Sequence, residues 1–116
     1  MKKSEIEKKY NEIIAYYGKD ETINLTNRVN CYRCNECGHI TKTRDIDKGV
    51  TPFMHLCEKC NGMAFSSFYE DIVPNQQPTQ EWYRPRLKKV YNMSDAMIEH
   101  ILNGGLDVRT ISKSNN

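Results

Sequence analysis

The chain has 116 residues, of which 38% are hydrophobic and 28% are charged, and its formal net charge is +2. This length predicts one domain, and the polar composition predicts a small core that needs a further cross-link. There is no apolar run long enough to cross a membrane, and the charged N-terminus lacks the apolar stretch of a secretory signal. We therefore expect a cytoplasmic protein without a membrane partner. In that reducing compartment the five cysteines favour metal binding over disulfides.

The N-terminal part of the chain is predicted to be a helix followed by a linker. Between residues 4 and 17, apolar side chains recur at the three- and four-residue spacing of one helix face. These side chains are Ile6, Tyr10, Ile13, Ile14 and Tyr17. Gly18 can close the helix, and the polar residues up to 30 predict a loop or a short strand. Residues 1–30 are therefore assigned to an N-terminal helix and linker.

The middle of the chain is predicted to be extended. Three segments rich in β-branched and aromatic residues favour strands, and they cover residues 40–44, 50–56 and 63–69. Pro52 cannot donate a backbone hydrogen bond, so the second of these strands should start late or lie at a sheet edge.

The C-terminal part is predicted to begin with an extended linker at residues 74–80 and to continue into a short helix. Ser94 is suited to cap that helix, and Gly104-Gly105 is suited to end it. Residues 106–111 alternate like a final strand, and residues 112–116 are expected to be a disordered tail.

Four cysteines form two C-x-x-C pairs, Cys34 with Cys37 and Cys57 with Cys60. A structural zinc site takes two sulfurs from each of two tight turns, so this spacing predicts one structural Zn²⁺ with four cysteine ligands. Such a site is closed and has no position for water or substrate. Gly38 and the Asn61-Gly62 pair follow the two motifs, where a positive φ can turn backbone N–H groups toward sulfur.

The segments Y-R-C-N-E-C-G at residues 32–38 and L-C-E-K-C-N-G at residues 56–62 resemble the zinc ribbon families. The resemblance implies two cysteine turns, a three-stranded antiparallel sheet and one structural zinc ion. We therefore expect a small α+β fold with a zinc ribbon over residues 31–73, an N-terminal helix and a short C-terminal helix. Residues 74–111 would pack on the ribbon as an extended segment, the short helix and the final strand. Zinc ribbons occur in transcription factors, polymerase subunits, ribosomal proteins and enzyme appendages, so the resemblance implies no single activity.

A second resemblance extends over residues 34–111 and leaves out the N-terminal helix. T-P-F-M, A-F-S-S-F-Y, E-W-Y-R-P and G-G-L, which begin at residues 51, 64, 81 and 104, look like segments of small uncharacterised zinc-ribbon proteins of bacteriophages. This resemblance implies a phage origin more than it implies a function.

Three further residues near the motifs are candidates for metal binding. Cys31 could replace Cys37, because Cys31 and Cys34 also form a C-x-x-C pair. We prefer Cys37, because Gly38 follows it, and expect Cys31 to be a buried or idle thiol. His39 and His55 flank the cysteines and are expected to lie beside the site or in solvent, since four sulfurs already complete it.

Residues 82–89 combine aromatic and basic side chains, namely Trp82, Tyr83, Arg84, Arg86, Lys88 and Lys89. Such a segment suits base stacking with phosphate contacts, and it equally suits a protein interface. The interpretation that we favour for Trp82 and Tyr83 is that they fold back and fill the small core.

The leading hypothesis is a non-enzymatic zinc-binding module that docks on nucleic acid or on a nucleic-acid-processing machine. The familiar hydrolase and nucleotide-binding signatures are absent from the sequence, and no small-molecule substrate is indicated. The alternative is a protein-interaction factor, such as a phage-derived inhibitor of a host enzyme or defence protein. A small nuclease is the least favoured hypothesis, because it needs clustered acidic residues.

Overall fold

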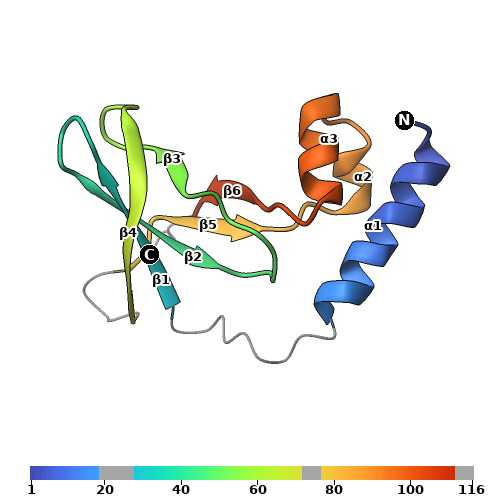
Figure 1. The fold of residues 1–116 in the computed structure, drawn as a ribbon, viewed down its shortest axis with the longest axis horizontal. Coiled ribbons are helices and arrows are strands. Elements are labelled where there is room, and N and C mark those ends of the chain that lie inside the picture. The colour runs from blue at the N-terminus through green and yellow to red at the C-terminus, as the bar shows by residue number, and fades with distance from the viewer. Residues whose placement is uncertain (19–27, 72–76, 112–116) are drawn as a thin grey trace, which may run out of the picture.

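A computed structural model describes residues 1–18, 28–71 and 77–111 of the chain. The described residues form three helices and six strands. In chain order these are α1 (Lys3–Gly18), β1 (Arg28–Cys34), β2 (Ile40–Asp45), β3 (Met54–Leu56), β4 (Met63–Asp71), β5 (Gln80–Tyr83), α2 (Leu87–Val90), α3 (Asp95–Leu102) and β6 (Asp107–Thr110). Figure 1 shows the strands gathered at one end of the molecule and the helices at the other. Within the described ranges, no helix has the length and apolar character needed to cross a membrane.

The six strands form one curled, mixed sheet in the order β3-β4-β1-β2-β5-β6. The central strand β1 pairs antiparallel with both β2 and β4, and β3 pairs antiparallel with β4 at one edge. On the other side, β5 runs parallel to β2, and β6 pairs antiparallel with β5. The protein is small and mixes helices with strands, as expected, but the predicted zinc ribbon with a three-stranded antiparallel sheet is wrong.

Two features make the sheet larger than predicted, and the sequence pattern shows neither of them. β1 starts at Arg28, inside the stretch predicted to be a linker, and its Val29, Cys31 and Tyr32 are fully buried. β5 pairs with β2 through contacts such as Thr43 with Gln80, which join segments far apart in the chain. Local alternation can identify a strand, but it cannot identify its partner across such a distance.

Several predicted elements are confirmed. The helix expected over residues 4–17 spans Lys3–Gly18, and Ser94 caps α3 by accepting the Met97 N–H at 3.3 Å. β3 starts at Met54, after Pro52, and lies at a sheet edge, as the proline predicted. The four-residue helix α2 was not predicted. The expected disordered tail, residues 112–116, lies outside the described residues, and so do residues 74–76 of the predicted linker.

The described residues form two clusters of buried side chains, one in the sheet and one among the helices. The sheet cluster consists of Tyr32, Cys34, Cys57, Ala64, Trp82 and Leu106. The helical cluster consists of Ile6, Tyr10, Val90, Ile98, Ile101 and Leu102. The Tyr10 hydroxyl donates to the Pro85 carbonyl at 2.7 Å, which ties α1 to the segment between β5 and α2.

Candidate metal centre

The four predicted cysteines come together where two tight turns meet. Cys34 ends β1 and Cys37 lies in the turn before β2, whereas Cys57 directly follows β3 and Cys60 lies in the turn before β4. All four Sγ atoms lie within 4.8 Å of one another. Pairs from opposite turns are closest, with 3.5 Å between the sulfurs of Cys34 and Cys60 and 3.7 Å between those of Cys37 and Cys57. This group is positioned to bind one metal ion.

The two turns have the same backbone geometry, although their sequences differ. In each turn the N–H of the first cysteine donates to the carbonyl five residues later, at 2.9 Å in the first turn and 2.8 Å in the second. The N–H four residues later donates back to that cysteine, at 3.1 and 2.9 Å. The returning residues are Gly38, with φ +75°, and Asn61, with φ +62°. The positive φ predicted after each motif is therefore confirmed.

Backbone N–H groups point at the sulfurs and favour the thiolate form. Cys34 Sγ accepts from the N–H groups of Glu36 and Cys37 at 3.3 and 3.4 Å, and Cys60 Sγ accepts from that of Gly62 at 3.3 Å. The Cys37 N–H makes the largest contribution to lowering the pKa of Cys34, which falls to about 6. The Gly62 N–H also acts to lower the pKa of Cys60, but the three neighbouring sulfurs raise it to about 12. Four negative charges thus cannot share this space without a cation, which a divalent metal would supply.

The donor chemistry narrows the choice of metal without fixing it. Four cysteine sulfurs drawn from two tight turns fit the tetrahedral sites that hold Zn²⁺, and the same set also suits iron. With four sulfurs bound, such a site leaves no open position for water, so the metal would hold the two turns together.

Cys31 and the two nearby histidines lie outside the sulfur group among the residues that the structure describes. Cys31 is fully buried in β1, and burial raises the pKa of its thiol. The His39 ring lies 3.4 Å from the Glu58 carboxylate. The His55 ring packs 5.2 Å from Trp82 and shares a hydrogen bond with Gln80 at 2.6 Å. Cys31 is thus a buried thiol, as expected.

The aromatic side chains of the segment 82–89 face the protein interior. Trp82 is only 3% exposed, and its indole N–H donates to the Thr43 hydroxyl at 3.0 Å. Tyr83 is also buried, and its ring lies 4.2 Å beneath the guanidinium of Arg109 and 5.0 Å from the Lys89 ammonium. The favoured interpretation, in which Trp82 fills the core, matches this packing, and neither ring is free to stack on a base.

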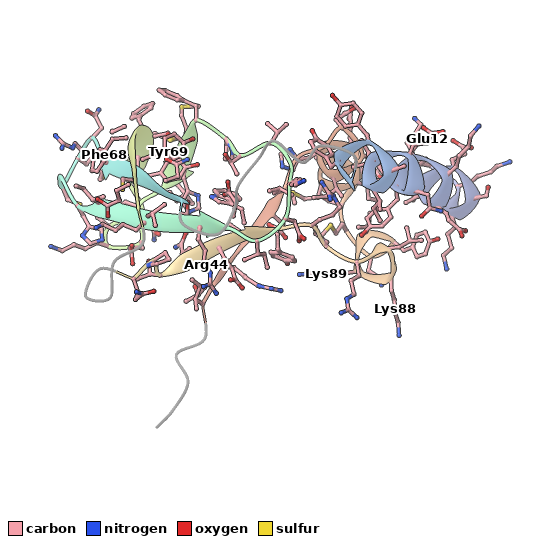
Figure 2. All side chains as sticks on the ribbon, turned by 90° about the horizontal axis from the view of Figure 1, so that it is seen from below. Glu12, Arg44, Phe68, Tyr69, Lys88 and Lys89 are labelled. Atoms are coloured by element: carbon pink, nitrogen blue, oxygen red, sulfur yellow. The ribbon has the colours of Figure 1, made fainter. Side chains whose placement is uncertain are left out.

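The basic side chains of the same segment line a pocket of about 490 Å³. Its walls contain Arg84, Arg86, Lys89 and Arg109, with Asp47 as the one carboxylate. The sequence pattern did not indicate Arg109, which reaches this place because β6 pairs with β5 and sets Arg109 opposite Glu81. The nearby Lys88 projects from α2 into solvent (Figure 2).

A group of exposed apolar side chains lies on β3, just before it and at the start of β4, and it was also missed. Phe53, Met54, Leu56 and Met63 are all more than two-fifths exposed, and Leu56 and Met63 are neighbours in the paired strands. The Phe53 ring packs 5.7 Å from that of Phe65. Alternation placed these residues on strands, but it could not show that this face of the sheet edge remains open.

Comparison of the chain with protein-family models, curated proteins and solved structures gives no significant match. The likeness to zinc-binding proteins therefore depends on the cysteine cluster itself. The resemblance to bacteriophage proteins stays a prediction.

Proposed function

We propose that this protein is a non-enzymatic, zinc-stabilised module that docks on nucleic acid through the phosphate backbone. The observation that carries the proposal is the basic pocket, in which four cations and one carboxylate converge beside the exposed Lys88. Cys34, Cys37, Cys57 and Cys60 would hold the Zn²⁺. The ion would stabilise the two turns and supply no catalytic chemistry, because four sulfurs complete its coordination.

The pocket contains cations that are already held in place. Lys89 donates to the Tyr83 hydroxyl, and Arg109 lies over the Tyr83 ring while donating to Glu81 at 2.8 Å. Arg84 donates to the Lys48 carbonyl, and its backbone N–H donates to Asp47 at 2.7 Å. Side chains fixed in this way lose less entropy when they contact an anion.

Arg86 of the pocket and the neighbouring Lys88 have no carboxylate partner among the described residues. Both side chains are exposed. Such side chains suit phosphate contacts, which release counterions from nucleic acid and make binding strongly dependent on salt. Because Trp82 and Tyr83 are covered, the proposal specifies backbone contacts without base stacking and therefore weak sequence preference.

Fluorescence anisotropy with labelled single- and double-stranded oligonucleotides, at low and moderate salt, tests the proposal. The double variant Arg86→Ala/Lys88→Ala should weaken binding. It should also reduce the slope of log affinity against log salt by roughly 0.7–0.9 for each phosphate that is no longer neutralised.

The matched control is Lys2→Ala/Lys8→Ala, just before α1 and on α1, which removes the same charge from exposed positions of the helical end. This control should keep the slope of the unmodified protein. Undetectable binding at low salt, or an equal loss of affinity in both double variants, would overturn the proposal.

A further inference from the structure

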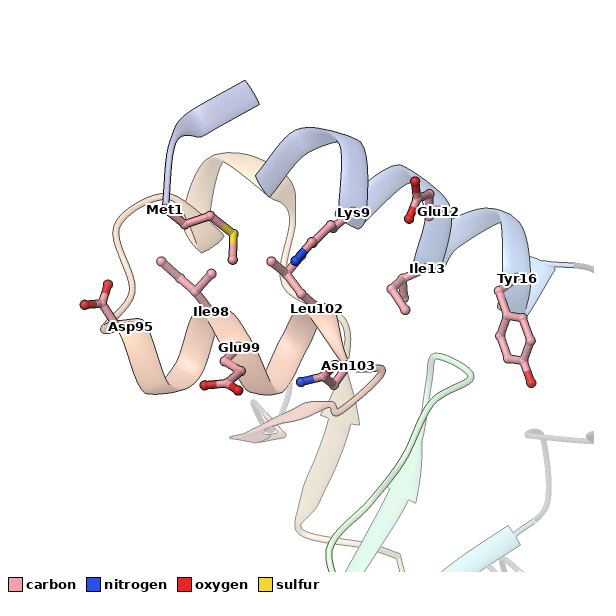
Figure 3. A pocket seen from close by; sticks show the side chains of 10 residues that line it. All are labelled: Met1, Lys9, Glu12, Ile13, Tyr16, Asp95, Ile98, Glu99, Leu102 and Asn103. Carbon is pink, nitrogen blue, oxygen red and sulfur yellow. The ribbon is translucent and has the colours of Figure 1, made fainter. Parts of the chain in front are cut away.

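We infer that the groove between α1 and α3 binds an amphipathic helix with basic flanks, contributed by a partner protein. This inference does not depend on the nucleic-acid proposal, since the groove shares no lining residue with the basic pocket. The groove has a volume of about 690 Å³, and Figure 3 shows its lining side chains. They come from the N-terminus, α1, α3 and the residue that follows α3.

The floor and one wall of the groove are apolar. Ile98 and Leu102 of α3 form the floor, where they are also members of the helical cluster. Ile13 and Tyr16 of α1 form the facing wall. Tyr16 is 69% exposed, and Met1, at the end of the groove, is 61% exposed. Large apolar side chains are thus open to solvent along a channel whose floor is already ordered, which suits side chains inserted by a partner.

The charges around the groove indicate the kind of partner. Glu12, Asp95 and Glu99 line it together with one basic side chain, that of Lys9. None of these four makes an ion pair with another described residue. Three acidic side chains against one basic side chain disfavour a nucleic acid and favour a partner that places lysine or arginine beside its apolar face.

The shape of the groove favours a helix as the occupant. α3 has eight residues, and at about 1.5 Å per residue it offers a wall roughly 12 Å long. A helix lying there would insert apolar side chains from one face at spacings of three and four residues, as helices bound in grooves commonly do. Its basic residues would then lie near Glu12 and Glu99 at the rim.

A synthetic helical peptide is the probe for this inference. The peptide has about fourteen residues, leucines at helical spacing on one face and lysines on the flanks, and a matched peptide carries glutamates in place of the lysines. In fluorescence anisotropy the lysine peptide should bind at least about tenfold more tightly than the glutamate peptide. Equal affinity for the two peptides, or no binding of either, overturns the inference.

Two pairs of variants locate the bound peptide. Ile13→Lys should weaken binding about tenfold or more, whereas Ile14→Lys should not, because Ile14 lies on α1 outside the groove. Glu12→Lys should weaken binding of the lysine peptide, whereas Glu7→Lys should not. If circular dichroism shows that Ile13→Lys has lost helix, the comparison of Glu12→Lys with Glu7→Lys locates the peptide instead, because both positions are exposed. An equal loss of affinity in either matched pair overturns the inference.

Sedimentation of the free protein tests a different occupant, a second copy of this chain. The protein should sediment as a monomer at the concentrations of the binding assay. A dimer that Ile13→Lys dissociates would show that a second copy occupies the groove, and it would overturn the inference.

Discussion

The sheet region, meaning the six strands and the two cysteine turns, and the helical region, meaning α1, α2 and α3, are built on different kinds of core. In the helical cluster, five of the six buried side chains are aliphatic. In the sheet cluster, two of the six are cysteines whose sulfurs belong to the candidate metal centre. The helical region therefore depends on apolar packing, whereas the sheet region depends on what its sulfurs bind.

Buried polar groups reinforce this difference. In the sheet, the Asn30 amide donates to the hydroxyls of Tyr32 and Tyr69 at 3.2 and 3.3 Å and accepts from the Ser66 hydroxyl at 2.7 Å. Such bonds replace bonds to water and add only about 0.5–1.5 kcal/mol each. They define the arrangement of the strands more than they stabilise it. A metal ion is then the expected main source of stability at the β3–β4 end of the sheet.

Removal of the metal should have the largest effect on stability, and it should destabilise the sheet region while leaving the helical region folded. Cys57→Ser should abolish binding of one equivalent of Zn²⁺ and expose amides of β3 and β4 to exchange, because the turns lose their cross-link. Amides of α1 and α3 should stay protected, since their cluster contains no sulfur ligand. Metal analysis and hydrogen exchange measure the two outcomes.

Cys31→Ser is the control for that experiment, because Cys31 is buried outside the sulfur group. It should retain one equivalent of metal. A variant series in which Cys31→Ser loses zinc while Cys37→Ser keeps it would contradict the assignment of the ligands.

The converse change should weaken the helical region and spare the metal. Ile101 is fully buried in the helical cluster, so Ile101→Ala should lower the free energy of unfolding by about 2–5 kcal/mol, because it removes packed atoms and leaves a cavity. Metal content should not change. Ile14→Ala, at a site that is 45% exposed, should change stability by less than about 0.5 kcal/mol. Urea unfolding compares the two, and a loss of zinc in Ile101→Ala would show that the regions are not separate.

An intermediate effect is expected at Glu81 of β5, which joins this strand to β2 and β6. Its carboxylate accepts from Arg44 at 2.9 Å and from Arg109 at 2.8 Å. Glu81→Gln should lower the free energy of unfolding at neutral pH by about 1–2 kcal/mol, because both arginines remain partly solvated. The exposed Glu7→Gln is the matched control and should have almost no effect.

The effect of Glu81→Gln should depend on pH. Burial acts to raise the pKa of Glu81, but hydrogen bonds from Arg109 and Arg44 outweigh it and hold this pKa below its ordinary value. A carboxyl with a lowered pKa stabilises the folded state above its unfolded pKa of about 4.3, and that stabilisation is lost as the pH falls through the folded value. The difference between Glu81→Gln and the unmodified protein should therefore shrink in acid. A constant difference between neutral and acidic pH would contradict the ion-pair explanation.

The parts that could be predicted from the sequence are those set by local chemistry. The spacing of the C-x-x-C pairs correctly predicted which four sulfurs lie together in the structure. The glycine at position 38 correctly indicated that Cys37, and not Cys31, belongs to this group. Periodicity found α1 and α3, and Pro52 correctly predicted a late edge strand. Each of these inferences needs only residues that are close in the chain.

The parts that failed depend on contacts between distant segments. The parallel pairing of β5 with β2 turned an expected extended segment into an inner strand of a larger sheet. The pairing of β6 with β5 in turn places Arg109 at the basic pocket. The groove likewise needs Ile13 of α1 beside Leu102 of α3, and hydrophobic patterning cannot tell which helices will meet.

The last comparison lies within the metal centre, where the two turns have the same backbone geometry but different residues. Gly38→Ala should cost about 1–2 kcal/mol, because an alanine at φ +75° is strained although no atom lies near its added Cβ. Gly38→Asn should cost less, since Asn61 already adopts φ +62° at the matching position. Thermal unfolding of the metal-bound protein ranks these variants.

Asn61→Gly completes that comparison from the other turn and should be close to neutral, because glycine adopts positive φ without strain. Gly62→Ala should act differently, since its Cβ would lie 3.2 Å from Cys34 Sγ and would displace the flexible Glu36 carboxylate. Its effect should appear as weaker metal binding in competition with a chelator, with little loss of backbone stability. If Gly38→Asn proved as costly as Gly38→Ala, the matching φ values of the two turns would not be what allows an asparagine at this position. The backbone is the same in both turns, since the Asn61 N–H donates to the Cys57 carbonyl at 2.9 Å and the Gly38 N–H donates to the Cys34 carbonyl at 3.1 Å. A high cost of Gly38→Asn would therefore have to come from the side chains around residue 38.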